Sequence, residues 1–322
     1  MNQGFWFLLS YLLAFLICLK VFPTVFGSIA IAFIFTVLID VIAELLEKLK
    51  LKRALSVPLA ATGFYGAIVY AFYSVFPIAL AEGRKIFSFE FALPDGKVSK
   101  ILESIVTYIN DNLETIILNV FSYLATNLPK LLTMTLLIIV ASAYLNVVKK
   151  HLSKSLDKLF PASSLGEIRK FMENSYKQIK RFSYGQLMTA LFVGFATALL
   201  SLLFKIPHAL FLGILAGITD LVPYMGVIVT AIPLFLLGFS AHGWWGLLFA
   251  FIILFSTNQL EMWVLAPRIS QRQVHINWFT ILISMFVFGY LYGIVGILIT
   301  VPMLILIKNM WNTFVVPYLK TH

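Results

Sequence analysis

The sequence predicts an all-α polytopic membrane protein with about six full transmembrane helices, two re-entrant helical hairpins that form an inverted repeat, and extracytoplasmic amphipathic helices. Of the 322 residues, 61% are hydrophobic and 12% are charged, against about 45–50% and 25% in soluble domains. Basic side chains gather in short segments beside apolar runs, as the positive-inside rule predicts. Two long apolar runs, 207–239 and 277–307, are each interrupted near the middle.

Residues 1–81 are predicted to hold three transmembrane helices. Two apolar stretches precede residue 40, and a third, 54–81, contains no charged residue. The loop 47–53 has a net charge of +3, from one acid and four basic side chains, so we expect this basic segment and the N-terminus in the cytoplasm. Asp40 and Glu44 end the second helix beside this basic segment, and we expect them to form structural ion pairs.

The next two segments are assigned to opposite sides of the membrane. Residues 82–128 contain four basic and six acidic side chains with a helical apolar pattern, so they are predicted to be amphipathic helices outside. Residues 129–181 contain a fourth apolar helix and then a linker. This linker, 149–181, has nine Lys or Arg against three acids, which places it in the cytoplasm.

The last two segments, 182–240 and 241–322, are each predicted to contain one full helix followed by one hairpin. The first hairpin is expected to break at Asp220 to Gly226, because the apolar stretch before the break is too short to cross a bilayer. Loop charge favours a hairpin over a single crossing, since a hairpin puts Arg268 and Arg272 in the cytoplasm. Two full short crossings would put them on the same side.

The second apolar run resembles the first. Shifted by 69 residues, it places Asn277 on His208 and Pro302 on Pro233. The charge argument gives the two copies opposite orientations, and inverted repeats of this kind are a common plan for transporters. We therefore expect the two hairpin tips to meet near the bilayer midplane. The alternative is two apolar helices with a chance similarity.

Several spaced motifs resemble those of the autoinducer-2 exporter family, which also includes members described as sodium or lithium/proton antiporters. They are GILAGITDLVPYMG at 213–226, Pro233, Glu261 with VLAPRI at 264–269, and FGYLYGIVGILITVP at 288–302. The resemblance implies a bacterial cytoplasmic membrane protein, a homo-oligomeric ring of five subunits, and autoinducer-2 as the solute. Where the family commonly has His-Pro before the last hairpin, this chain has Asn277-Trp278.

Asp220 is the main candidate for a substrate-binding or ion-binding residue. A charge at membrane depth costs at least roughly 2.5–3.5 kcal/mol on insertion scales, so it is kept for a reason. The alternative is that Thr219 or Asp220 caps the returning half-helix, whose first turn suits Pro223. Tyr224 and Gly226 complete this predicted tip, with Tyr224 supplying a hydroxyl group or simply packing.

Two further groups of candidates lie elsewhere in the sequence. Asn258 and Glu261 are three residues apart on one helix face and are predicted to converge on one ligand, although Glu261 could instead pair with Arg268. The second tip is predicted at Gly289, Tyr290, Gly293 and Gly296, where glycine lets the two hairpins approach closely.

The sequence argues against an enzyme, because it has no phosphate-binding loop, zinc-protease helix or nucleophile elbow. It predicts no cofactor, no metal site and no nucleic-acid partner. The expected partners are the lipid bilayer and a small polar solute or a monovalent cation or proton. The leading function is solute export without ATP hydrolysis. The alternatives are a Na⁺(Li⁺)/H⁺ antiporter and a passive, channel-like facilitator.

The predicted topology can be tested with single cysteines in a chain whose one natural cysteine, Cys18, has been replaced. A cysteine at position 270 or in 149–181 should react with a membrane-impermeant thiol reagent only after the cells are opened. A cysteine in 82–128 should react in intact cells. Labelling of position 270 from outside would contradict the argument for the first hairpin.

Overall fold

The computed structural model describes residues 3–70, 132–146, 158–223, 225–265 and 276–321, with a few single residues between them. These residues form helices and short connections, and no strand occurs among them. Six of the described helices are long and apolar enough to cross a membrane, among them α8 and α11, which were predicted as parts of hairpins. The prediction of an all-α polytopic membrane protein is confirmed. The predicted extracytoplasmic segment 82–128 lies outside the described residues.

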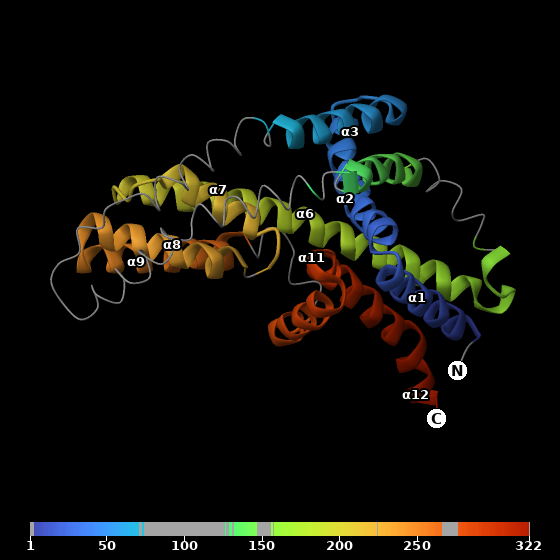
Figure 1. Cartoon of the computed structure of the whole chain (residues 1–322). Helices are drawn as coiled ribbons and strands as arrows, with labels where there is room; N and C mark the ends of the chain where they lie inside the picture. The colour runs from blue at the N-terminus through green and yellow to red at the C-terminus, as the bar shows by residue number, and fades with distance from the viewer. Residues whose placement is uncertain are drawn as a thin grey trace. The chain divides into compact units, whose positions relative to one another are not determined.

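The main helices follow the order of the predicted apolar stretches (Figure 1). They are α1 (Gln3–Val21), α2 (Pro23–Lys48), α3 (Arg53–Tyr70), α6 (Leu165–Leu203), α7 (Ala209–Thr219), α8 (Met225–His242), α9 (Trp244–Leu260), α11 (Trp278–Met310) and α12 (Val316–Thr321). The predicted fourth span is the helix Leu132–Asn146. Short turns of other helix types lie at Ala162–Ser164, Glu261–Leu265 and Trp311–Val315.

The chain divides into two compact units. The first contains Met1–Thr62, Pro129–Tyr184 and Gln271–His322, and the second contains Gly63–Leu128 and Gly185–Ser270. The first predicted hairpin belongs to the second unit, and the second predicted hairpin belongs to the first unit. Because the two units are described separately, the meeting of the two tips stays a prediction.

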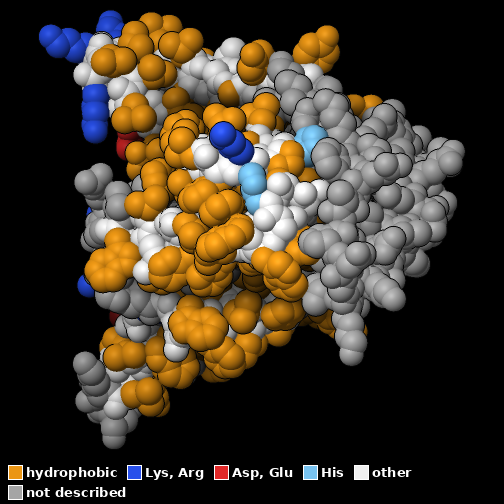
Figure 2. All heavy atoms as spheres, turned by 90° about the vertical axis from the view of Figure 1, so that its left-hand side faces the viewer, with side chains coloured by type: hydrophobic (Ala, Val, Ile, Leu, Met, Phe, Trp, Pro, Cys, Tyr) orange, Lys and Arg blue, Asp and Glu red, His pale blue; other side chains and the backbone are white. Residues whose placement is uncertain are grey.

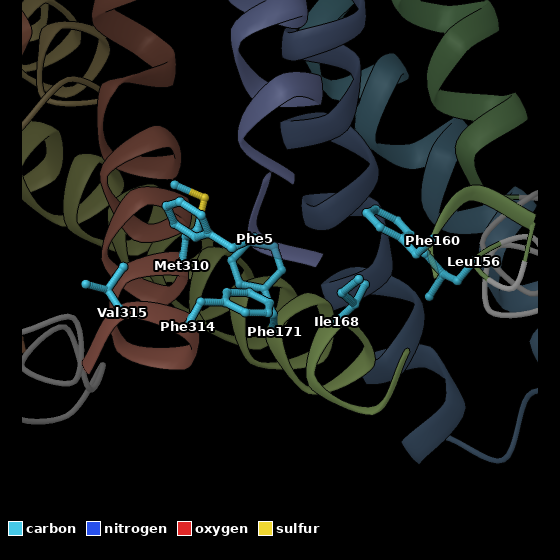
Figure 3. Close-up of a cluster of buried hydrophobic side chains, with 8 residues drawn as sticks. All are labelled: Phe5, Leu156, Phe160, Ile168, Phe171, Met310, Phe314 and Val315. Carbon is cyan, nitrogen blue, oxygen red and sulfur yellow. The ribbon is translucent and has the colours of Figure 1, made fainter. Parts of the chain in front are cut away.

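The core of the first unit joins segments that are far apart in the sequence. Phe5 of α1 packs with Phe171 of α6 and Phe314 near the C-terminus, and the rings of Phe5 and Phe314 have centroids 6.2 Å apart (Figure 3). Gly4 lies against Ser164, whose hydroxyl accepts a hydrogen bond of 3.1 Å from the Gly4 backbone N–H. These contacts fix the start of α1 to the start of α6.

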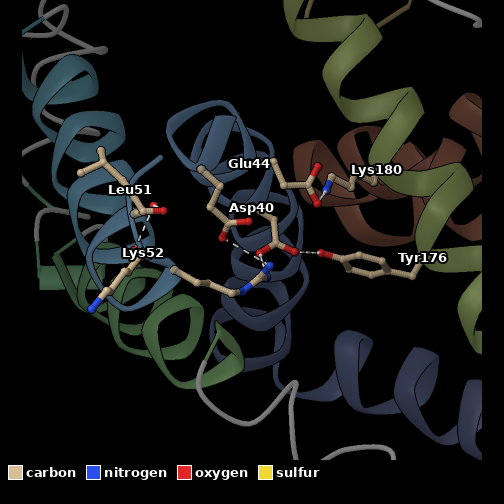
Figure 4. A network of polar contacts seen from close by, with 9 residues as sticks. Asp40, Glu44, Leu51, Lys52, Tyr176 and Lys180 are labelled. Carbon is tan, nitrogen blue, oxygen red and sulfur yellow. Dashed lines mark hydrogen bonds and ion pairs between the residues drawn. The ribbon is translucent and has the colours of Figure 1, made fainter. Parts of the chain in front are cut away.

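Polar contacts in the first unit bind α2 to α3 and α6 (Figure 4). Arg53 donates to Asp40 at 3.2 Å, and the Tyr176 hydroxyl donates to the other carboxylate oxygen of Asp40. Lys180 pairs with Glu44 at 2.5 Å. The prediction that Asp40 and Glu44 form structural ion pairs is confirmed.

The chain reverses direction inside α11, at Gly293. Its φ of 63° and ψ of −147° lie in a region that is essentially restricted to glycine. A Cβ on Gly296 would overlap the carbonyl oxygen of Phe288, eight residues earlier. In a straight helix eight residues span about 12 Å, so this contact requires the two arms to fold back on each other. At the end of these two arms that is farthest from Gly293, Asn277 of the first arm and Lys308 of the second line one cavity.

Helices α7 and α8 also form a helical hairpin, with Asp220 of the turn packed against Gly226. Both predicted chain reversals are therefore present. Re-entrance itself stays a prediction, because α8 with 18 residues is long enough to cross on length alone.

The closest helix packing in the second unit involves glycine. Gly243, with φ of 59°, makes the turn between α8 and α9. A Cβ on Gly238 would lie 2.5 Å from the carbonyl oxygen of Gly246, and a Cβ on Gly246 would overlap the Gly238 carbonyl. The two backbones therefore touch directly, as in other membrane helix pairs with small residues at the interface.

The outward faces of the second unit's helices are apolar. Figure 2 shows hydrophobic side chains over most of the described part of the side on which α7, α8 and α9 lie in Figure 1. Exposed apolar side chains of α6 to α9 include Leu191, Phe195, Leu210, Ile218, Ile232, Trp244, Trp245, Phe251 and Phe255. A soluble monomer rarely exposes so large an apolar surface, so this surface suits a protein surrounded by lipid.

Replacing Gly246 with alanine should lower the thermal unfolding temperature, because the new methyl group must push α8 and α9 apart. Overpacking of this kind typically costs about 1–3 kcal/mol. The matched control is Gly66→Ala in α3, where a Cβ meets nothing within 4 Å. There alanine should be neutral or stabilising, since it favours a helix by about 1 kcal/mol over glycine. Equal unfolding temperatures for the two variants would contradict the close packing of α8 and α9.

Candidate functional site

Asp220 follows the last residue of α7 and is the most deeply buried acid among the described residues of the second unit, with 2% of its surface exposed. Its Oδ2 atom has no hydrogen-bond partner among the described residues. Burying an unpaired polar group costs about 1–3 kcal/mol, and burying a charge costs far more. Asp220 therefore lowers stability as it stands, which favours a role in binding.

The turn that holds Asp220 is closed by backbone hydrogen bonds between residues that are three apart in the sequence. Val222 N–H donates to Thr219 at 3.1 Å, and Met225 N–H donates to Val222 at 3.1 Å. Pro223 lies half-buried within this turn, just before α8. Tyr224, the other predicted residue of the tip, lies outside the described residues.

The capping alternative for this turn is narrowed to Asp220, whose Oδ1 atom lies beside the first turn of α8, and for Asp220 it stays a prediction. The Thr219 hydroxyl donates within its own helix, to the carbonyl oxygens of Leu215 at 2.6 Å and Ala216 at 3.2 Å. It is therefore not the cap of α8. The backbone N–H of Asp220 closes the end of α7 by donating to Ala216 at 2.9 Å, while Oδ2 of Asp220 caps no described N–H.

Gln186 of α6 holds the turn in place, and our sequence analysis missed it. Its side-chain amide donates to the backbone carbonyl oxygen of Asp220 at 2.5 Å, and the residue is buried. A side-chain amide within the full helix predicted in 182–240 was the signal that could have found it. The bond uses the backbone of Asp220 and does not involve its carboxyl group.

Gly226 gives the Asp220 side chain its space. A Cβ on Gly226 would lie 2.7 Å from both Cβ and Oδ1 of Asp220. The carboxyl group therefore packs directly on the first turn of α8. The structure brings these two predicted residues together, and glycine is needed for their contact.

The buried faces of α8 and α9 form two facing stripes. The stripe of α8 contains Gly226, Thr230, Leu234, Leu237 and Gly238, and that of α9 contains Gly246, Ala250, Ile253 and Thr257. Gly238 lies against Gly246 and Ala250. Toward the Asp220 end of this helix pair, the buried stripes continue to Thr230, eight residues from Gly238, and to Thr257, eleven residues from Gly246. Neither hydroxyl oxygen has a hydrogen-bond partner among the described residues.

Of the predicted pair Asn258 and Glu261, only Glu261 lies near Asp220. Glu261 lies one turn beyond Thr257, is half-buried, and is close enough to Asp220 for the two carboxyl groups to interact electrostatically. It opens a π-helical turn, Glu261–Leu265, a feature often found at functional sites. Asn258 is exposed, so the polar neighbour on the buried stripe is Thr257. The alternative partner, Arg268, lies outside the described residues.

The second predicted tip belongs to the first unit. Gly293 makes its reversal, Gly296 faces Phe288, and a Cβ on Gly289 would meet Ile297 at 3.0 Å. Tyr290 is 92% exposed beside this reversal. These glycines are required by the hairpin itself. Among the described residues, no cluster of three His, Cys, Asp or Glu side chains could hold a metal ion.

Comparison with known proteins shows the family of this chain. Residues 9–315 match the family described as AI-2E family transporter. The chain belongs to this family. It is 35% identical to a protein of Thermotoga maritima named "Putative transport protein", over 96% of this chain and 97% of that protein. It is 28% identical to "Putative transport protein YueF" of Bacillus subtilis, over 88% and 83%. A role in membrane transport follows from this membership.

Replacing Asp220 with asparagine should leave the thermal unfolding temperature in detergent unchanged or higher, because an amide costs less to bury than an unpaired carboxylate. The matched control is Asp40→Asn, which weakens the contacts with Arg53 and Tyr176. It should lose about 2 kcal/mol, as expected for hydrogen bonds to a charged group. If both variants lost the same stability, Asp220 would have a stabilising partner in the folded protein.

Proposed function

We propose that this protein exports a small polar solute, such as autoinducer-2, across the bacterial cytoplasmic membrane without ATP hydrolysis, and that it works as a homo-oligomer. The observation that carries the proposal is the buried carboxyl group of Asp220 at the break between α7 and α8. A membrane protein keeps such a group where it binds something that crosses.

The tip has the groups that a polar solute needs. The Asp220 carboxylate accepts hydrogen bonds from hydroxyl groups, and the first turn of α8 has backbone N–H groups without helical acceptors. Gln186 and Gly226 keep the carboxyl group in position from two sides. A broken helix with such a tip is the usual form of a solute site in secondary transporters.

The energy for transport is proposed to come from a gradient of the solute or of an ion, since the sequence has no ATP-binding loop. A second candidate function is a Na⁺(Li⁺)/H⁺ antiporter. The observation in its favour is the electrostatic contact between Asp220 and Glu261, because two neighbouring acids favour the binding of a cation or a proton. A passive facilitator remains the third candidate.

The test is a flux assay with the full-length protein in proteoliposomes. The wild type should move autoinducer-2 down an imposed gradient, and Asp220→Asn should reduce the rate at least tenfold because the amide no longer offers a carboxylate to the solute. Measuring Na⁺ and Li⁺ flux under a pH gradient in the same vesicles separates the exporter from the antiporter.

The control variant is Glu44→Gln, which changes an acid that is paired with Lys180. It should transport at close to the wild-type rate. Normal autoinducer-2 flux in Asp220→Asn would refute the role of Asp220. Cation flux without solute flux would replace the exporter by the antiporter.

A further inference from the structure

A cavity of about 390 Å³ lies at the base of the second hairpin, at the end of the α11 arms farthest from Gly293. Its volume is within the range of ligand pockets, about 300–1,000 Å³. Four of the residues that line it have polar side chains, namely Asn277, Thr280, Lys308 and Trp311. The other lining residues are apolar, and none of the lining residues is an acid.

The polar groups of the cavity are mainly hydrogen-bond donors. Lys308 has a positive charge and three N–H donors, and the Trp311 indole can only donate. The Oδ1 atom of Asn277 accepts a hydrogen bond of 3.1 Å from the Phe279 backbone N–H. The part of the Asn277 side chain that a ligand can use is therefore its NH₂ group. A ligand for this set needs several acceptor oxygens and a negative charge, and a phosphate group has both.

The sequence around the cavity is typical of a membrane–water interface. Residues 278–307 contain no charged side chain, and Lys308 is the first charged residue after them. Trp278 and Trp311, at this end of the hairpin, are 61% and 55% exposed. Tryptophan is enriched at the level of the lipid head groups, and lysine side chains near helix ends extend to the same level. The phosphate that this cavity meets is therefore that of a phospholipid.

The apolar part of the lining suits the rest of such a lipid. Leu304 lies one turn before Lys308 on the second arm, and Ile276 precedes the first arm. A free phosphate ion gains nothing from these apolar side chains, whereas the glycerol backbone and the first methylene groups of a lipid do. A head group with its own ammonium would bring a second positive charge toward Lys308. A lipid with a net negative charge therefore fits better.

We infer that the cavity between Asn277 and Lys308 binds the head group of an anionic phospholipid, with its phosphate held by the Lys308 ammonium and the side-chain N–H groups of Asn277 and Trp311. The Thr280 hydroxyl adds a donor from the first arm. Lys308 also has an interaction within the chain, and its three N–H groups allow both contacts. Because the donors come from both arms, the bound lipid holds the base of the hairpin together. This site is separate from the proposed role of Asp220 and does not depend on it.

The experiment measures lipid binding by the full-length protein, purified in detergent and freed of bound lipid. Thermal unfolding is followed while phosphatidylglycerol, phosphatidylcholine with the same acyl chains, glycerol 3-phosphate or inorganic phosphate is added. Native mass spectrometry counts the lipids that remain bound. Phosphatidylglycerol should raise the unfolding temperature of the wild type in a saturable way, as a ligand of the folded state must. Phosphatidylcholine should do so only at higher concentration, and the two soluble phosphates should have no effect.

The variants change one donor each. Lys308→Gln should raise the half-saturating concentration of phosphatidylglycerol about fivefold, as expected for one basic side chain near an anionic lipid. Trp311→Phe and Thr280→Val remove one donor with little change of shape and should raise it by a smaller factor. The matched control is Lys205→Gln, which removes an exposed lysine that does not line this cavity. It should bind phosphatidylglycerol as the wild type does.

Three results would overturn the inference. The first is an equal response to phosphatidylglycerol and phosphatidylcholine, and the second is a Lys308→Gln variant that binds phosphatidylglycerol as tightly as the wild type. The third is an effect that inorganic phosphate reproduces, which would make the cavity an anion site without a lipid. If Lys308→Gln does not fold, unchanged binding by both Trp311→Phe and Thr280→Val overturns the inference instead.

Discussion

The contact between the backbones of α8 and α9 at Gly238 and Gly246 determines the rest of the second unit. Because neither residue has a side chain, the helices approach until backbone meets backbone, and no sliding or rotation is possible without a clash. The antiparallel pairing that results runs the Thr257 end of α9 alongside the Thr230 end of α8, and Glu261 interacts electrostatically with Asp220. A wider separation filled by leucine would allow several registers. Two glycines near the Gly243 turn therefore set the position of polar groups several helical turns away.

Two buried aspartates show how structural and functional acids differ in this protein. Asp40 lies between Arg53 and Tyr176, so its charge is balanced and both carboxylate oxygens have partners. Asp220 is as deeply buried, yet its Oδ2 has no described partner, and the charged group near it is another acid. The partners of Asp40 stabilise the fold, whereas the unpaired oxygen of Asp220 destabilises it. The loss at Asp220 is tolerable because the other contacts of α6 to α9 hold the turn, and it leaves one carboxylate oxygen, Oδ2, without a described partner.

Much of this arrangement could be predicted from the sequence, because the strongest signals are local. The break at Asp220 to Gly226 follows from an acid, a proline and a glycine within an apolar run, and the reversal at Gly293 follows from three glycines in a run too long for one straight span. The choice between Asn258 and Thr257 could not be predicted. Adjacent residues on a helix point about 100° apart, and only the contact at Gly246 decides which of them faces α8. Gln186 was missed for a similar reason, since its partner is a backbone carbonyl 34 residues away, which no spacing rule indicates.

The two hairpins have the same general form but different chemistry. In the first, the chain needs several residues to turn between α7 and α8, and these carry a carboxyl group and lead into a helix whose first N–H groups are free. In the second, one residue, Gly293, makes the whole turn, because its backbone adopts a conformation closed to other residues. A turn of one glycine offers no side chain to a ligand, and the nearby Tyr290 points away from the packed arms. The polar side chain at the first turn and the close packing of Gly296 on Phe288 at the second therefore follow from how many residues each turn needs.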